Sequence, residues 1–134
     1  MQLILIAKEK GFAGFPGDGA NRWSAVGTAD AASLFRLALE GATGGTQWHA
    51  IDDEGIPFRE IAQSIGDRLG LPTGSIPSDQ MPEYFGGFLA MPVRLDVPAT
   101  STITRRVLGW QPFQPGLLAD FDNGHYFAAS SKIN

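Results

Sequence analysis

Hydrophobic residues recur at helical spacing in residues 29–41 (ADAASLFRLALEG). Four apolar side chains fall on one side, at the i, i+3, i+4, i+7 spacing of a buried stripe: Ala31, Leu34, Leu37 and Ala38. Thr28 precedes them as a suitable N-cap, and Gly41 can end the helix. The pattern predicts a helix packed on one face.

A second helical pattern runs from about Pro57 to Leu69. Ile61, Ile65 and Leu69 are spaced by four, and charged residues occupy the opposite side. Proline is tolerated at the first helical position, because its missing N–H would be unpaired there. Gly70 follows and is expected to end the helix.

Shorter apolar runs between turn residues predict extended segments. We expect a strand at Phe12–Phe15, a turn through Gly17–Gly19 and a second extended segment at Arg22–Val26. Thr46–Ile51 (TQWHAI) is predicted as a strand, with a turn at Asp52–Gly55. A disordered glycine loop is disfavoured, because the aromatic residues of these segments need burial.

The remaining pattern predicts several short helical pieces. They are residues 3–10 ended by Gly11, residues 79–86 capped by Ser78, residues 85–95 broken near Pro92, residues 101–106 capped by Ser101 or Thr102, and part of residues 116–127. The chain is therefore expected to form a single small α/β or α+β domain over residues 1–134. About three short strands separated by helices would leave an exposed sheet edge.

Composition excludes several classes of function. The chain has 134 residues and a net charge of -4, which offers no basic surface for nucleic acid. It has no cysteine, which excludes disulfide scaffolds and thiolate zinc sites. The apolar stretch Leu3–Ala7 is too short to span a membrane and lacks the features of a signal peptide. These observations predict a soluble cytoplasmic protein without membrane or nucleic-acid partners.

Three motifs carry a resemblance to a known family. Arg22–Ala32 (RWSAVGTADAA) resembles the segment R-x-x-x-V-H-x-x-D-x-A of extended short-chain dehydrogenases/reductases, the NAD-dependent epimerase/dehydratase group. Leu108–Pro112 (LGWQP) is similar to the LGWxP sequence near the C-terminus of that group, and Phe58–Gly70 also looks like it. The resemblance covers roughly residues 11–127. It implies the C-terminal, substrate-side lobe of a Rossmann-type fold.

The resemblance also implies a role for Arg22, which in sugar-nucleotide epimerases contacts the phosphate or polar end of the substrate. A guanidinium can do so through bidentate hydrogen bonds. The alternative is a surface arginine, or one paired with Asp18. Trp23, Tyr84 and Phe85 are the other candidate substrate-binding residues. Gly27 departs from the family pattern, which has histidine there.

Five residues are expected to be structural. Asp30 lies in the first helical turn, where a carboxylate can accept backbone N–H groups. Trp110 is expected to be a buried aromatic in a tight turn that fixes the end of the chain. The structural motif comprises Asp30, Leu108, Gly109, Trp110 and Pro112.

Two elements of dehydrogenase chemistry are missing from the sequence. The glycines near residues 11–19 are not followed by a predicted helix, so they cannot offer a pyrophosphate the N–H groups of a helix N-terminus. No tyrosine has a lysine four residues later, since Tyr84 is followed by Phe88 and Tyr126 by Ser130. We therefore expect no catalytic residue and no bound cofactor in this chain, although an intact family member would use NAD(P).

A metal site is not expected either. The two histidines are His49 and His125. His49 lies in the strand predicted at Thr46–Ile51, where a structural role is expected. It stands near the acidic run Asp52–Glu54, whose spacing matches no metal-ligand pattern and whose carboxylates are expected to face water.

Three hypotheses follow. The chain is the substrate-binding lobe of an NAD(P)-dependent epimerase/dehydratase-like oxidoreductase, inert alone. Alternatively, it is a module that binds a small polar ligand near Arg22, Trp23 and residues 82–95. In the third hypothesis, its sheet edge and apolar surface mediate homodimerisation or docking onto a Rossmann nucleotide-binding domain.

Overall fold

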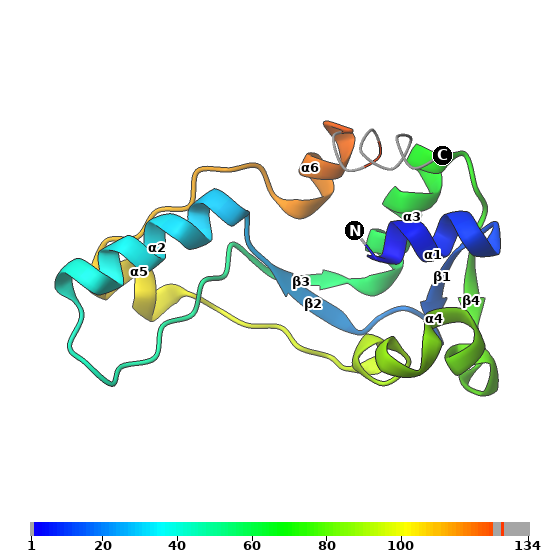
Figure 1. Cartoon of the computed structure of the whole chain (residues 1–134), viewed down its shortest axis with the longest axis horizontal. Helices are drawn as coiled ribbons and strands as arrows, with labels where there is room; N and C mark the ends of the chain where they lie inside the picture. The colour runs from blue at the N-terminus through cyan, green and yellow to red at the C-terminus, as the bar shows by residue number, and fades with distance from the viewer. Residues whose placement is uncertain (1, 125–126, 128–134) are drawn as a thin grey trace.

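The molecule has two parts joined by a two-stranded ribbon. A computed structural model describes residues 2–124 and residue 127. Figure 1 shows the ribbon of β2 (Arg22–Ala25) and β3 (Asp53–Pro57) between a larger part on the right and the smaller α2–α5 lobe on the left. The α2–α5 lobe consists of α2 (Thr28–Gly41), α5 (Thr102–Leu108) and the irregular segments beside them. The expectation of a small α/β fold with few short strands is confirmed.

The larger part is built around helix α3 (Phe58–Leu69), with α1 (Gln2–Lys10), β1 (Ala13–Pro16) and β4 (Thr73–Ile76) against it. The predicted stripe on α3 is confirmed: Ile61 and Ile65 are almost fully buried, whereas Leu69 is partly buried. Pro57 is the N-cap rather than the first helical residue, and Gly70 ends the helix in the left-handed region.

β1 and β4 pair in parallel, with Ala13 opposite Thr73. Gly14 on β1 lies so close to Ile76 and Tyr84 that a Cβ atom there would collide with both side chains. The strand predicted at Phe12–Phe15 is confirmed with a shift of one residue. The second strand of this pair was not predicted.

The ribbon corrects the prediction for residues 46–57. Thr46–Ile51 pairs with no strand among the described residues, whereas β3 occupies most of the expected turn at Asp52–Gly55. β3 pairs antiparallel with β2, Trp23 lies opposite Ile56, and Ile56 is buried. The strand therefore forms where a partner and a core are available, although the local pattern is stronger upstream.

Helix α2 confirms the predicted helix but not its cap. Gly27 is the N-cap residue, and Thr28 is the first helical residue. The side chain of Gln114 supplies the acceptor instead, since its Oε1 accepts the Ala29 N–H at 3.0 Å. Leu34 is buried, whereas Leu37 is only partly buried.

The chain after β4 contains short helices, as expected. A 3-10 turn at Ser78–Gln80 leads into α4 (Met81–Leu89), a second one spans Pro92–Arg94, and α5 and α6 (Leu117–Asp122) follow. Neither Ser78 nor Ser101 caps a helix through its side chain. The Ser101 hydroxyl instead donates to the Ile51 carbonyl at 2.6 Å.

Some expectations fall outside what the structure describes. His125 and Tyr126 lie there, as does most of the chain after residue 124. Among the described residues, none of the helices has the length and apolar character needed to cross a membrane.

Candidate functional site

Arg22, the first residue of β2, is fixed by hydrogen bonds to Asp96. The Arg22 guanidinium donates from Nε to Asp96 Oδ1 at 3.0 Å and from Nη2 to Asp96 Oδ2 at 2.9 Å. The Arg22 backbone N–H also donates to Asp96 Oδ1, at 2.7 Å. These hydrogen bonds lower the pKa of the Asp96 carboxyl and raise the pKa of the Arg22 guanidinium. Asp96 therefore orients Arg22.

The pair leaves part of the arginine available. A guanidinium carries five N–H donors, and Asp96 takes two of them. About half of each side chain is exposed. Among the described residues, no acceptor contacts Arg22 Nη1, so this edge of the guanidinium can donate hydrogen bonds to a ligand. Arg22 is thus a half-exposed surface arginine whose partner is Asp96 and not the alternative Asp18, which accepts the Ala20 N–H.

An open hollow of about 360 Å³ lies beside Arg22. Its other lining residues come from β3 and from the extended segment before α5: Glu54, Gly55, Pro98, Ala99 and Thr100. That segment is held along the ribbon, because Val97 N–H donates to the Arg22 carbonyl at 2.7 Å and Ala99 N–H to the Glu54 carbonyl at 2.8 Å. The hollow therefore has backbone-fixed walls on two sides.

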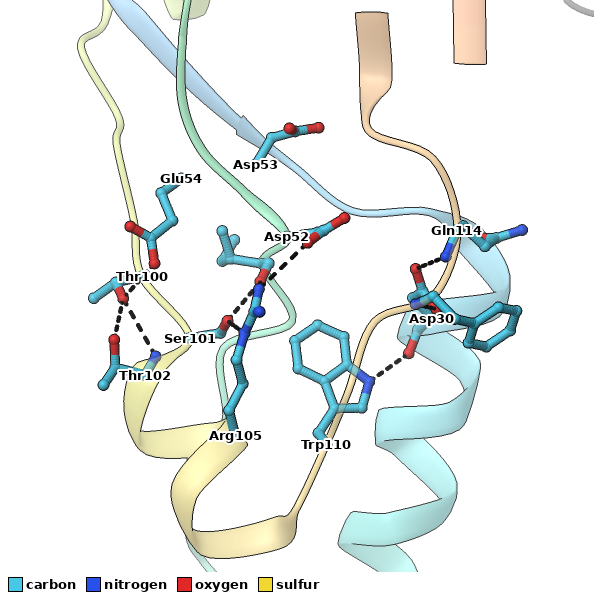
Figure 2. A network of polar contacts seen from close by, with 12 residues as sticks. Asp30, Asp52, Asp53, Glu54, Thr100, Ser101, Thr102, Arg105, Trp110 and Gln114 are labelled. Atoms are coloured by element: carbon cyan, nitrogen blue, oxygen red, sulfur yellow. Dashed lines mark hydrogen bonds and ion pairs between the residues drawn. The ribbon is translucent and has the colours of Figure 1, made fainter. Parts of the chain in front are cut away.

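A row of oxygen atoms continues from this hollow (Figure 2). The Thr100 hydroxyl donates to Glu54 Oε1 at 2.8 Å and lies 2.8 Å from the Thr102 hydroxyl. Glu54 also lines a second, wider hollow with Asp52, Thr102, Arg105 and Arg106. The two hollows share Glu54 as a lining residue, and together we call them the Arg22 groove.

The charge of the groove limits what it attracts. At the Arg22 end, the guanidinium is paired with Asp96, and Glu54 lines the same hollow, so the local charge is not positive. Such an environment favours hydrogen bonding over attraction of an anion. Within the described part of the chain, no group of acidic or histidine side chains could hold a metal ion.

The acidic run corrects another expectation, because its carboxylates do not merely face water. Asp52 pairs with Arg105 at 3.3 Å, and Asp53 Oδ2 accepts the Leu117 N–H at 2.7 Å at the start of α6. Glu54 accepts from Thr100. Each carboxylate of the run fixes a different later segment to the ribbon.

The predicted structural motif forms the support of the α2–α5 lobe (Figure 2). Asp30 is fully buried, and its two carboxylate oxygens accept the N–H groups of Phe113 and Gln114 at 2.8 and 3.0 Å. Trp110 is buried as expected, and its Nε1 donates to the Asp30 carbonyl at 2.9 Å. Asp30 therefore holds the distant C-terminal segment rather than its own helix.

The other residues of the motif shape the same turn. Gly109 ends α5 with φ of 67°, a conformation that favours glycine. Leu108 is the last residue of α5, and both it and Pro112 are half-buried. Arg105 lies over the Trp110 ring, 5.7 Å from its centre.

The remaining predicted substrate-binding residues lie apart from the groove. Trp23 is partly buried and packs edge-on against Phe58, with ring centres 5.1 Å apart. Tyr84 and Phe85 are buried, and the Tyr84 hydroxyl donates to the Phe12 carbonyl at 2.6 Å. The contacts of these two residues are structural, and ligand binding by them stays a prediction.

Asp96, Glu54 and Thr100 were not predicted as neighbours of Arg22, because no local pattern in the sequence indicates these contacts. His49, expected in a strand, lies in an irregular segment, where its backbone N–H and carbonyl contact the Thr104 hydroxyl. The glycine turn after β1 leads into β2 and not into a helix. These glycines therefore do not fit a dinucleotide pyrophosphate, which needs a helix N-terminus.

Similar proteins are known from two fungi. No protein-family model matches the sequence. An uncharacterized protein of Schizosaccharomyces pombe is 45% identical over 125 residues, which are 93% of this chain and 42% of that protein. An uncharacterized protein of Saccharomyces cerevisiae is 48% identical over 118 residues, 88% of this chain and 39% of that protein. The chain thus spans about two-fifths of the length of these relatives.

The fold is similar to part of a dehydratase. The crystal structure of DesIV, a dTDP-glucose 4,6-dehydratase from Streptomyces venezuelae with NAD and TYD bound, matches 97% of this chain with a TM-score of 0.69. A DesIV double mutant with NAD and DAU bound matches 93% with a TM-score of 0.61. Both are 18% identical, and the match covers 38% of each DesIV chain. At this identity the relation is one of fold.

Proposed function

We propose that this chain forms the substrate-side lobe of an NAD(P)-dependent epimerase/dehydratase-like oxidoreductase, and that the Arg22 groove receives the polar part of the substrate. The observation that carries the proposal is the pair of hydrogen bonds from Arg22 to Asp96. They hold the Arg22 guanidinium beside a hollow and leave some of its N–H donors for a ligand. The likeness to part of an NAD-bound dehydratase supports it at the level of the fold. Nucleotide chemistry would belong to the part of the longer relatives that this chain does not span.

The charge of the groove defines the expected substrate. The arginines Arg22, Arg105 and Arg106 are balanced by the carboxylates of Asp52, Glu54 and Asp96, and this balance favours hydroxyl groups, which both donate and accept, over a bare anion. The Thr100 and Thr102 hydroxyls and Glu54 extend this pattern along the groove. A sugar joined to a nucleotide presents hydroxyls at one end and an anionic pyrophosphate in its middle. The groove fits the sugar end of such a molecule best.

Titration of the ¹⁵N-labelled chain with dTDP-glucose, glucose and inorganic pyrophosphate tests the proposal by nuclear magnetic resonance. Amide signals of Arg22, Ala99 and Thr100 should shift and saturate with dTDP-glucose, and Arg22→Ala should abolish the shifts. Arg36→Ala is the matched control, because Arg36 is exposed on α2 and lines neither hollow of the groove. It should leave binding unchanged.

Two results would overturn the proposal. Unshifted signals with every sugar-containing probe would show that the groove binds no such ligand. Equal shifts in wild type and Arg22→Ala would place binding elsewhere. Pyrophosphate binding as strong as that of dTDP-glucose would contradict recognition of hydroxyls and replace it with recognition of an anion.

A further inference from the structure

Asn21, the residue before β2, is attached to the segment that carries Asp96. Its side-chain Nδ2 donates to the Val93 carbonyl at 2.7 Å and to the Leu95 carbonyl at 3.1 Å. Both N–H groups of the amide are thereby used, and the reverse orientation would bring the amide oxygen against two carbonyl oxygens. The orientation of the Asn21 side chain is therefore fixed by its two acceptors.

Asn21 joins a part of the chain that is held by the core to a part that is not. Its backbone carbonyl accepts the Phe58 N–H at 2.7 Å, and Phe58 is buried at the start of α3. Val93 is fully buried in the same apolar cluster as Phe58. Leu95, in contrast, is about half exposed (51%), so core packing does not hold it. The second hydrogen bond of the Asn21 amide therefore fixes a residue that packing leaves loose.

The residue after Leu95 is Asp96, the partner of Arg22. Three donors of Arg22 reach the Asp96 carboxylate, namely the backbone N–H, Nε and Nη2. The Val97 N–H donates in turn to the Arg22 carbonyl at 2.7 Å. Two consecutive residues at the start of the ribbon thus hold three consecutive residues of the later segment.

The Arg22–Asp96 pair depends on this attachment because burial does not protect it. The two side chains are 49% and 48% exposed. An ion pair between exposed side chains contributes little to its own stability, because ordering two flexible side chains offsets the attraction. Such a pair keeps one geometry only where the backbone on both sides is already held. The pairing of β2 with β3 holds the backbone of Arg22, and the Asn21 amide holds the backbone that leads into Asp96.

We infer that Asn21 is a positioning residue of the Arg22 groove: its amide fixes the backbone that carries Asp96, and Asp96 then directs the remaining N–H donors of Arg22 toward the ligand. The inference rests on the proposed function, in which these donors bind the polar part of the substrate. Asn21 itself lines neither hollow of the groove, so it acts through Asp96 and not by contact with the ligand.

The Arg22 Nε–H signal of the ¹⁵N-labelled chain, recorded by nuclear magnetic resonance without ligand, tests the inference. In wild type this proton should exchange with water at least about 10-fold more slowly than that of Arg36, which is exposed on α2 and has no acceptor among the described residues. Asn21→Leu keeps the approximate size of the side chain but has no donor, and it should speed the exchange at Arg22 about 10-fold. Asn123→Leu is the matched control, because Asn123 is exposed at the end of α6, and it should leave the exchange unchanged.

Binding of dTDP-glucose provides the second measurement. Its Kd should rise about 10-fold in Asn21→Leu, and Asn21→Ser, which keeps a single donor, should lie between this variant and wild type. In an Asp96→Asn background, Asn21→Leu should have no further effect on the Kd, because Asn21 acts through Asp96. A residue that serves stability alone would weaken binding equally in both backgrounds.

Unchanged exchange at Arg22 in Asn21→Leu would overturn the inference, as would an equal loss of binding in both backgrounds. Should Asn21→Leu fail to fold, the Arg22 exchange rate in Asn21→Ser decides in its place, and a rate equal to that of wild type would overturn the inference. Bound dTDP-glucose with unchanged Arg22 exchange is a failure of this inference alone. Absence of dTDP-glucose binding, even with faster Arg22 exchange in Asn21→Leu, would reject the proposed function and with it the role of Asn21 in the groove.

Discussion

Replacing Asp30 by asparagine tests whether one buried carboxylate fixes the α2–α5 lobe. The two carboxylate oxygens accept the Phe113 and Gln114 N–H groups, and the side chain is fully buried. Asparagine keeps the size but has one oxygen. Its NH₂ group must therefore face one of the two backbone N–H groups, and that hydrogen bond is replaced by a contact between two donors.

The expected loss follows from the number of bonds affected. A hydrogen bond to a charged group contributes about 1.5–3 kcal/mol, and a buried donor left unsatisfied costs about 1–3 kcal/mol. Because one bond is lost and the other no longer involves a charge, the lobe should be destabilised by about 3 kcal/mol. A difference of this size corresponds to roughly a 100-fold change in an equilibrium constant.

Amide exchange of Phe113 and Gln114 measures this loss where it occurs, and urea unfolding followed by circular dichroism measures the rest of the chain. Asp30→Asn should speed the exchange of both amides by about 100-fold. Asp79→Asn makes the same chemical change at an exposed position and should alter stability by less than about 0.5 kcal/mol. An acceleration below about 3-fold in Asp30→Asn would refute the role assigned to the carboxylate.

Two further predictions concern close contacts. Gly27→Ala should be less stable in urea unfolding than the matched variant Gly44→Ala, by about 1 kcal/mol. A Cβ atom at position 27 would collide with the Gln114 amide that caps α2, whereas a Cβ atom at position 44 meets open space. Equal stability of the two variants would show that the cap contributes nothing. Tyr84→Phe should cost about 2 kcal/mol, because the Gly14 N–H loses its acceptor. Burial raises the pKa of the Tyr84 phenol above its ordinary value of 10.0. Tyr84 therefore ionises more readily in the unfolded chain, and wild type should lose stability as the pH rises above 10.0. Tyr84→Phe should lack this contribution to the alkaline loss of stability, and identical curves of stability against pH for the two proteins would contradict the assigned role of Tyr84.

Helices with a local signal could be predicted from the sequence. The spacing of Ile61 and Ile65 is enough to place α3, since the period of a helix decides which side is buried. The same reasoning places α2 from Leu34. It fails at the cap, because Gln114 supplies the acceptor from 85 residues away in the chain. Sequence spacing contains no information on such a contact.

Strands and the candidate site depend on distant partners. Thr46–Ile51 has the stronger strand pattern, but β3 forms because Ile56 and Asp53 have opposite residues on β2. Arg22 could be picked out from its motif, whereas Asp96 could not, since 74 residues separate them. For Tyr84, tertiary packing places the ring in the core, and ligand binding by this residue stays a prediction.

The start of α5 connects the groove to the irregular segment that follows α2. Thr100 and Thr102 line the groove, and the Thr100 carbonyl lies 3.3 Å from the His49 ring Nδ1. The His49 backbone is in turn attached to α5, because its N–H donates to the Thr104 hydroxyl at 3.2 Å and its carbonyl accepts from that hydroxyl at 3.0 Å. The hydroxyl row beside Glu54 is therefore coupled to residues 46–51. Any ordering of these residues that ligand binding requires would lower the affinity of the groove, because the cost of ordering is subtracted from the binding free energy.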